Sequence, residues 1–279
     1  MYRYSATQWI YGRESLARSL DRLKKYGYDG IELAGEPRTT DVEEVRRLLR
    51  ERDMTCTSIC GIYSSERDLS SSDRAVRSHA VQYVKDCVDL ASETGAPLVI
   101  VVPSAVGRAR PDSEKEEAWN HAVGSLREAG EYAASQGIEL AIEALNRYET
   151  DLVNKLETAV RMIEEVGSGH VKLMADLFHM SIEERNVEQS FKRIAPYLVH
   201  VHIADNTREA AGMGRTDFGE VVRALRDIAY KGAITMEFLP PSANPYSAAE
   251  RSGSDELMDE YTAMSIREIK KQVRLLAEA

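Results

Sequence analysis

The sequence predicts an α/β protein built as a closed parallel barrel of eight βα units, a (β/α)8 or TIM barrel. Strand-like apolar segments and amphipathic helical segments alternate eight times along the 279 residues. That length suits one barrel, for which about 250 residues is typical. No Pro- or Gly-rich linker divides the chain, and the first strand–helix turn lacks the G-x-G-x-x-G of a dinucleotide-binding open sheet. We therefore expect residues 1–279 to form a single domain.

Short apolar segments define the expected strands, and three-and-four spacing of apolar residues defines the helices between them. Leu16, Leu20 and Leu23 form the stripe of the first helix, and Gly27 is its expected end. Helices at 74–94 and 118–136 should end at glycines in the same way. A long polar loop is expected at 238–256, over the barrel mouth, before a terminal helix at 261–279. The expected strands are RYSATQW (3–9), YDGIELAG (28–35), MTCTSICG (54–61), PLVIVVPS (97–104), IELAIEAL (138–145), VKLMADLF (171–178), LVHVHIAD (198–205) and GAITMEFL (232–239).

Composition narrows the classes of partner. The formal net charge is −10 and the pI is near 5.3, whereas nucleic-acid binders usually carry a basic stripe. There is no run of 18 apolar residues that would span a membrane, and the start MYRYSATQWIYG lacks the features of a signal peptide. The three cysteines are an odd number for a disulfide framework. We expect a cytoplasmic protein with buried free thiols and no nucleic-acid or membrane partner.

Four residues that bind divalent metals or move protons stand at the ends of the last four predicted strands. They are Glu143, Asp176, His202 and Glu237. Because the carboxyl ends of barrel strands meet at one mouth, these side chains should lie together. Their mixed oxygen and nitrogen donors suit Mn²⁺, Co²⁺, Mg²⁺ or Fe²⁺. A divalent cation would also hold three crowded carboxylates ionised, although each of them would otherwise raise the others' pKa values.

Further polar residues follow these strand ends at short distances in the sequence. Glu149, His179 and Arg208 together could grip the hydroxyl and carbonyl groups of a polyol. For Glu149 the alternatives are an ion pair with Arg147 or a helix cap, and for Arg208 the alternative is a solvated loop charge. His200 has the strand parity of His202, so we expect it inside the barrel as a core histidine.

At these residues the chain resembles the xylose-isomerase-like sugar isomerase/epimerase superfamily. It is most similar to ketose 3-epimerases of the D-tagatose, D-psicose and L-ribulose type, and to keto-sugar-acid epimerases. The segments IEALNRYET, ADLFHMSIEE, HVHIADNTRE followed by GMGRTDF, and TMEF carry the resemblance. It implies that Glu143, Asp176, His202 and Glu237 bind one divalent metal ion. Manganese is the expected ion, with cobalt or magnesium as alternatives.

The resemblance also implies an activity. Glu143 and Glu237 would face opposite sides of a substrate carbon, so that one removes a proton and the other returns one through an enediolate. Glu149, His179 and Arg208 match positions that hold the substrate's carbonyl end. The implied function is a metal-dependent epimerase or isomerase of a keto-sugar or keto-sugar acid, assembled as a dimer or tetramer.

The chain departs from the ketose 3-epimerases near the mouth, which leaves the substrate open. Ala-Asp at 204–205 replaces a common glycine–glutamate pair. The segment 58–73, with Tyr63 and Arg67, is the place where we expect substrate selection. Arg108 and Arg110 could hold a carboxylate or phosphate, or they could be exposed loop charges.

Two rival functions remain open on the sequence. The same enediolate would permit β-elimination, which gives a lyase or dehydratase acting on a keto-polyol or a 3-keto-glycoside. A non-catalytic sugar-binding barrel subunit is the other rival. The presence of both Glu143 and Glu237 speaks against it, because binding alone does not require two opposed proton carriers.

Overall fold

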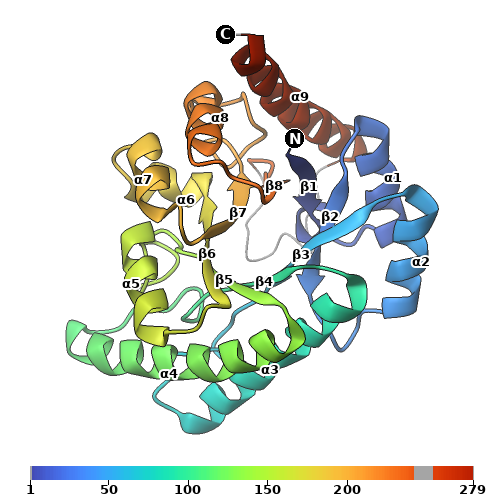
Figure 1. The fold of residues 1–279 in the computed structure, drawn as a ribbon. Coiled ribbons are helices and arrows are strands. Elements are labelled where there is room, and N and C mark those ends of the chain that lie inside the picture. Colours follow the sequence, from blue (N-terminus) through green and yellow to red (C-terminus); the bar gives the residue numbers. More distant parts are fainter. Residues whose placement is uncertain (1, 242–253, 279) are drawn as a thin grey trace.

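The computed structural model describes residues 2–241 and 254–278, and Figure 1 shows its strands forming a ring that is surrounded by helices. Neighbouring strands are parallel, and β8 pairs with β1, so the barrel is closed. The predicted (β/α)8 fold is confirmed. The strands are β1 (Arg3–Thr7), β2 (Gly30–Gly35), β3 (Thr55–Gly61), β4 (Leu98–Val101), β5 (Glu139–Ile142), β6 (Val171–Asp176), β7 (Leu198–Ile203) and β8 (Ala233–Met236).

The helices form the outer layer around the barrel (Figure 1). Two of them, α6 and α7, lie between β6 and β7 in the chain. Among the described residues, no helix is both long enough and apolar enough to cross a lipid bilayer. The helices are η1 (Gln8–Tyr11, a 3-10 helix), α1 (Leu16–Tyr26), α2 (Val42–Arg52), α3 (Arg74–Thr94), α4 (Asp112–Gln136), α5 (Leu156–Val166), α6 (Leu177–Glu183), α7 (Val187–Ile194), α8 (Phe218–Asp227) and α9 (Asp255–Glu278).

The element boundaries differ from the prediction where local chemistry competes with periodicity. Gly27, Gly95 and Gly137 end their helices in the left-handed conformation, as predicted. Helix α4 begins at 112 instead of 118, because its first turns, DSEKEE, have no apolar stripe to reveal them. Strand β6 stops at Asp176, whose side chain accepts the N–H of Phe178 at 2.7 Å and starts α6. Most of the loop predicted at 238–256 lies outside the described residues.

The barrel lumen is divided into an apolar and a polar half. In the polar half, the Ser5 and Thr235 hydroxyls lie 2.6 Å apart and Thr57 donates to Ser5 at 2.9 Å. These contacts join β1, β3 and β8 through the lumen, so inward polar groups are satisfied by one another. Cys56, Cys60 and Cys87 are free and buried, as predicted. The apolar half consists of Cys60, Leu98, Ile100, Ala141 and Met174.

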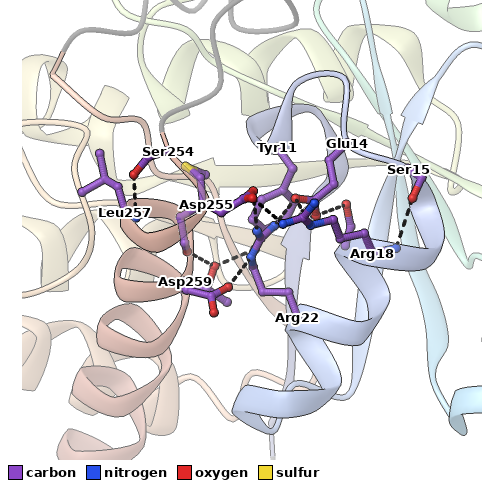
Figure 2. A network of polar contacts seen from close by, with 12 residues as sticks. Tyr11, Glu14, Ser15, Arg18, Arg22, Ser254, Asp255, Leu257 and Asp259 are labelled. Carbon is purple, nitrogen blue, oxygen red and sulfur yellow. Dashed lines mark hydrogen bonds and ion pairs between the residues drawn. The ribbon is translucent and has the colours of Figure 1, made fainter.

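The C-terminal helix α9 closes the outer ring beside α1 and α8 (Figure 1). Figure 2 shows the polar network that joins α9 to α1. The Arg22 guanidinium donates to Glu14 and, at 2.7 Å, to Asp259 of α9. Its side chain is 4% exposed, so its charge is balanced by these carboxylates and not by water. The buried Arg22 side chain therefore ties α9 to the start of the chain through the partly exposed Asp259.

Candidate active site at the mouth of the barrel

The four predicted metal-ligand residues converge at the carboxyl ends of β5 to β8. Glu143 and Glu237 directly follow the last residues of β5 and β8, and Asp176 ends β6. Asp176 and His202 are register partners on β6 and β7. Alternate residues of a strand point to opposite faces, and the residue before each of the four packs in the main hydrophobic core. Each of the four is thus the last inward-facing position of its strand.

The geometry of this group fits a divalent cation. One ligand atom from each residue lies within 4.8 Å of those of the other three. The residues are between 0 and 6% exposed. Among the described residues, Asp176 Oδ2 and His202 Nδ1 are buried without a hydrogen-bond partner. Buried polar atoms normally have partners, so two unpartnered lone pairs in one acidic cluster are what a cation-binding site provides.

The electrostatics of the three carboxyl groups are unequal. Burial and the neighbouring Glu237 raise the pKa of Glu143 well above its usual value. The same two causes raise the pKa of Asp176 to about 8. Burial would also raise the pKa of Glu237, but His202 and Arg208 outweigh it and lower that pKa to about 2. Crowding thus opposes ionisation of Glu143 and Asp176, and a divalent cation is the group whose charge would hold all three ionised.

His179 provides a neutral N–H donor beside the ligand group, the name used below for Glu143, Asp176, His202 and Glu237. The backbone N–H of Asn146 donates to His179 Nδ1 at 3.1 Å, so the ring proton is on Nε2. That Nε2 lies 3.6 Å from Asp176 Oδ2 and 3.9 Å from Glu143 Oε1. Burial and the charge of Arg208 lower the pKa of His179 to about 3, which keeps the ring neutral. His179 can therefore donate to an oxygen that approaches Glu143 and Asp176.

Arg208 and Glu149 form a buried pair that borders the same ligand group. Arg208 Nη1 lies 3.1 Å from Glu149 Oε1, and its Nη2 lies 3.6 Å from Glu237 Oε2. The Arg208 side chain is only 12% exposed, so the alternative of a solvated loop charge is wrong. The expected alternative of a Glu149–Arg147 pair is also wrong, because Arg147 binds Glu183 at 2.9 Å.

The loop that carries Arg208 is organised by one buried carboxylate. Asp205 accepts the N–H groups of Asn206 at 2.8 Å, Gly212 at 3.0 Å and Thr216 at 3.1 Å. Within this loop Arg208 has a φ of 64°, the left-handed region that side chains other than glycine rarely adopt. The surrounding hydrogen bonds therefore hold Arg208 in a backbone conformation that is unfavourable for a residue with a side chain.

The cavity above the ligand group has a volume of about 340 Å³ and has a polar and an apolar lining. Small-molecule sites are typically apolar pockets in which a few polar groups point toward the ligand. A larger cavity of about 410 Å³ lies at the amino ends of the strands, but barrel active sites occupy the carboxyl face. The polar lining consists of Glu143, Glu149, His179, Arg208 and Glu237, and the apolar lining includes Trp9, Ile62, Tyr63, Val102, Val106 and Leu145.

The two arginines expected in the loop after the fourth strand bind neighbouring carboxylates. Arg108 Nη1 lies 2.6 Å from Asp68 Oδ2, and Arg110 lies 3.4 Å from Asp151. Asp68 is fully buried and Arg110 is 3% exposed. For Arg110 the expectation of an exposed loop charge is wrong, because its guanidinium is buried near Asp68 and Asp151.

The segment 58–73 contributes apolar surface to the cavity. Ile62 and Tyr63 line the cavity, as the expected role in substrate selection requires. Arg67, in contrast, forms a fork with Glu36, with both nitrogen–oxygen distances at 3.1 Å. This segment therefore offers hydrophobic contact to a ligand, while its arginine is engaged within the protein.

Three supporting residues are missing from the sequence-based site. Glu32 lies 3.1 Å from His202 Nε2, Asn146 contacts His179, and Asp205 organises the Arg208 loop. A signal for Glu32 was present: it is a carboxylate in the middle of a predicted buried strand, which is costly without a partner. His200, expected as a core histidine, is fully buried in the lumen.

Fold and cavity together define a β/α-barrel protein with a candidate divalent-metal centre and a small-ligand cavity at the carboxyl ends of its strands. The sequence profile described as "Xylose isomerase-like TIM barrel" matches residues 20–259. The chain therefore belongs to the xylose isomerase-like TIM barrel family, and the resemblance noted from the sequence is confirmed.

Sugar epimerases are among the relatives of this chain. The chain is 31% identical over 235 residues to 3-dehydro-D-guloside 4-epimerase of Escherichia coli, covering 80% of this chain and 87% of that protein. It is 29% identical over 227 residues to D-psicose 3-epimerase of Ruminiclostridium cellulolyticum, covering 78% and 76%. The crystal structure of D-allulose 3-epimerase from Methylomonas sp. with D-allulose superposes with a TM-score of 0.87, at 25% identity and 97% coverage of both chains.

Proposed function

We propose that this chain is a divalent-metal-dependent epimerase of a keto-sugar, with manganese as its ion. One observation carries the proposal: Glu143 and Glu237 are buried carboxylates that line one cavity and share a ligand group with Asp176 and His202. Membership of the family and the sugar epimerases among its relatives support the same activity. A binding protein without chemistry would not need two such proton carriers.

The two glutamates divide the reaction into two proton transfers. One removes the proton from the carbon beside the substrate carbonyl, which gives an enediolate, and the other returns a proton to the opposite face of that carbon. The net result is inversion at one carbon. A divalent cation held by the four ligand residues would polarise the substrate carbonyl and make the neighbouring C–H bond more acidic.

His179, Arg208 and Glu149 hold the substrate's carbonyl end in this proposal. The Nε2–H of His179 and the guanidinium of Arg208 donate to substrate oxygens, and Glu149 accepts from a hydroxyl. Preformed donors aimed at a developing negative charge stabilise it more than mobile water does. The apolar lining then receives the remainder of the sugar and excludes water.

The substrate class that we propose is an uncharged keto-sugar or 3-keto-glycoside. Two neighbouring arginines that could recognise a carboxylate or phosphate are paired within the protein, Arg108 with Asp68 and Arg67 with Glu36, and Arg208, which lines the cavity, is paired with Glu149. This pairing favours an uncharged substrate over a keto-sugar acid. We also propose that the protein is a homodimer or homotetramer, that it is cytoplasmic, and that it has no nucleic-acid partner. Light scattering after gel filtration tests the assembly.

Solvent exchange provides the direct test. The purified chain with Mn²⁺ is incubated in heavy water with ketohexoses, ketopentoses, keto-sugar acids and 3-keto-glycosides, and the products are analysed by NMR. We expect at least one uncharged substrate to give its epimer with deuterium at the inverted carbon. An unsaturated or cleaved product would identify a lyase instead. Bound Mn²⁺ without exchange in any substrate would favour a sugar-binding subunit.

A further inference from the structure

A polar cluster lies in the barrel lumen next to the proposed metal centre. It consists of Glu32 from β2, Ser58 from β3, and His200 and His202 from β7, all fully buried. Strands β2 and β7 are not neighbours in the barrel, so Glu32 meets the histidines across the lumen. His202 contacts Glu32 with one ring nitrogen, Nε2, at 3.1 Å. Its other nitrogen, Nδ1, faces Glu237 Oε2 at 3.4 Å.

We propose that Glu32 is a positioning residue, which accepts the Nε2–H of His202 and thereby presents the Nδ1 lone pair to the metal centre. A carboxylate oxygen only accepts, so the shared proton belongs to Nε2. A neutral ring with its proton on Nε2 has its free electron pair on Nδ1, and His202 Nδ1 is buried without a hydrogen-bond partner, as are Glu32 Oε1 and His200 Nδ1 of the same cluster. This inference rests on the metal centre of the proposed function.

Ser58 holds the Glu32 carboxylate in place. Its hydroxyl donates to Glu32 Oε2 at 2.6 Å, and both side chains are fully buried. Partners of this kind, behind a metal-binding histidine, fix the orientation of the ring and select its tautomer. Because His202 is clamped at Nε2, little ordering of its ring would remain when an ion is bound at Nδ1.

The same residues have a second interpretation, as a metal site of their own. His200 Nε2 lies 2.9 Å from Glu32 Oε2, so Glu32, His200 and His202 could surround an ion. His202 would then bridge two ions and lose its single ring proton. In the positioning arrangement it needs to lose none, and Ser58 already occupies Glu32 Oε2. We therefore expect one ion per chain.

Calorimetric titration with Mn²⁺ tests the inference without measuring activity. Glu32→Gln keeps the size of the side chain but replaces one acceptor oxygen by an N–H donor. We expect its Kd for Mn²⁺ to rise about 10–100-fold, the usual effect of losing such a partner. The matched control is His200→Gln, which disturbs the same cluster but leaves the Glu32–His202 contact in place. Its Kd should change less than about threefold, and circular dichroism verifies that both variants fold.

NMR of ¹⁵N-histidine-labelled chain measures the tautomer of His202 directly. With Mg²⁺ as a diamagnetic probe, His202 should carry its proton on Nε2, and ion binding should shift the Nδ1 signal. The signals are assigned by their absence in His202→Asn. This measurement on the unsubstituted chain decides the matter even if Glu32→Gln does not fold, because a proton on Nδ1 would overturn the inference.

The possible failures can be told apart. An unchanged Kd in a folded Glu32→Gln variant, with tight binding to the unsubstituted chain, would overturn the role of Glu32 alone. Two Mn²⁺ ions per chain, with one lost in His200→Gln, would replace it by the second metal site. An unsubstituted chain that binds neither Mn²⁺ nor Mg²⁺ would overturn the metal centre and this inference with it.

Discussion

Replacing Glu143 or Glu237 singly by glutamine should separate the two proton transfers of the proposed reaction. Glutamine has the size of glutamate and keeps an oxygen that can bind a cation, but it cannot carry the proton. In each variant the remaining glutamate still reaches one face of the substrate carbon. We therefore expect each variant to exchange the solvent proton with only one of the two epimers, and neither variant to interconvert them.

The size of the expected loss in epimerisation rate depends on whether another group in the cavity can transfer the proton in place of the missing glutamate. A positioned acid–base group contributes roughly 10²–10⁴-fold, or about 2.7–5.4 kcal/mol. Glu143 and Glu237 are 6% and 5% exposed, so bulk water has little access to act in their place. Glu149 lines the same cavity but is held by Arg208 at 3.1 Å. We therefore expect losses in the upper half of that range.

The assay follows deuterium uptake into each purified epimer by NMR at saturating Mn²⁺. Mn²⁺ affinity is measured in parallel, because both glutamates belong to the ligand group. The matched control is Glu149→Gln, which removes a carboxylate of the same cavity outside that group and should raise KM while both epimers still exchange. If Glu143→Gln or Glu237→Gln exchanged both epimers alike, or converted them at more than about a tenth of the normal rate, the two-glutamate mechanism would be wrong.

Three further perturbations test the site and its supports. Burial and Glu237 raise the pKa of Asp176 to about 8, so the folded chain retains a proton that the unfolded chain releases near pH 4. Stability without Mn²⁺ should therefore fall as the pH rises from about 5 to 8. The increase in Tm caused by Mn²⁺ should grow over this range, and it should grow less steeply in Asp176→Asn, where Glu143 alone among the ligand carboxyls retains a raised pKa. Asp205→Ala removes the acceptor that organises the Arg208 loop. Initial-rate kinetics should therefore show KM raised about tenfold or more and kcat changed less. A tenfold rise corresponds to roughly one charge-assisted hydrogen bond between Arg208 and the substrate. Arg22→Met leaves the buried carboxylate of Glu14 without its Arg22 partner and should cost about 3 kcal/mol in urea unfolding, whereas Asp259 is partly exposed and keeps Lys25 and Tyr26. Arg18→Met, at a side chain 57% exposed, should cost less than about 1 kcal/mol, and equal losses would contradict the role assigned to the buried Arg22 side chain in Figure 2.

The order of elements was predictable from the sequence because strands and helices bury apolar residues with different periods. Gly27, Gly95 and Gly137 added local evidence, since each occupies the left-handed position that ends a helix. The exact ends were not predictable where a side chain intervenes. Asp176, for example, ends β6 and caps α6 in one step, although the apolar run continues through residues 177–178. The periodicity of apolar residues indicates which side chains are buried, but it does not indicate which side chains cap a helix.

The meeting of the four predicted ligand residues was also predictable, because one rule places all strand carboxyl ends at the same mouth. The partners of charged side chains were not. Arg110 has loop neighbours in the sequence, but its partner Asp151 comes from the next βα unit. Glu32 and His202 are 170 positions apart and meet only because the barrel closes. Such pairings depend on the three-dimensional path of the chain, which no local pattern in a single sequence contains.

Glu143 and Glu237 are the same residue type but have different surroundings in the barrel. The proposed reaction requires such a difference, because one glutamate must act as an acid and the other as a base. Glu237 Oε1 accepts the indole N–H of Trp9 at 3.0 Å, and its Oε2 lies near His202 and Arg208. The Trp9 N–H and the charge of Arg208 favour its ionised form, whereas Glu143 has burial and a neighbouring carboxylate against it. A shared cation would draw both glutamates toward ionisation, but the Trp9 hydrogen bond acts on Glu237 alone. The asymmetry is therefore built into the side chains around the candidate metal site, and in the proposed reaction it would make Glu237 the first proton acceptor and Glu143 the group that carries a proton.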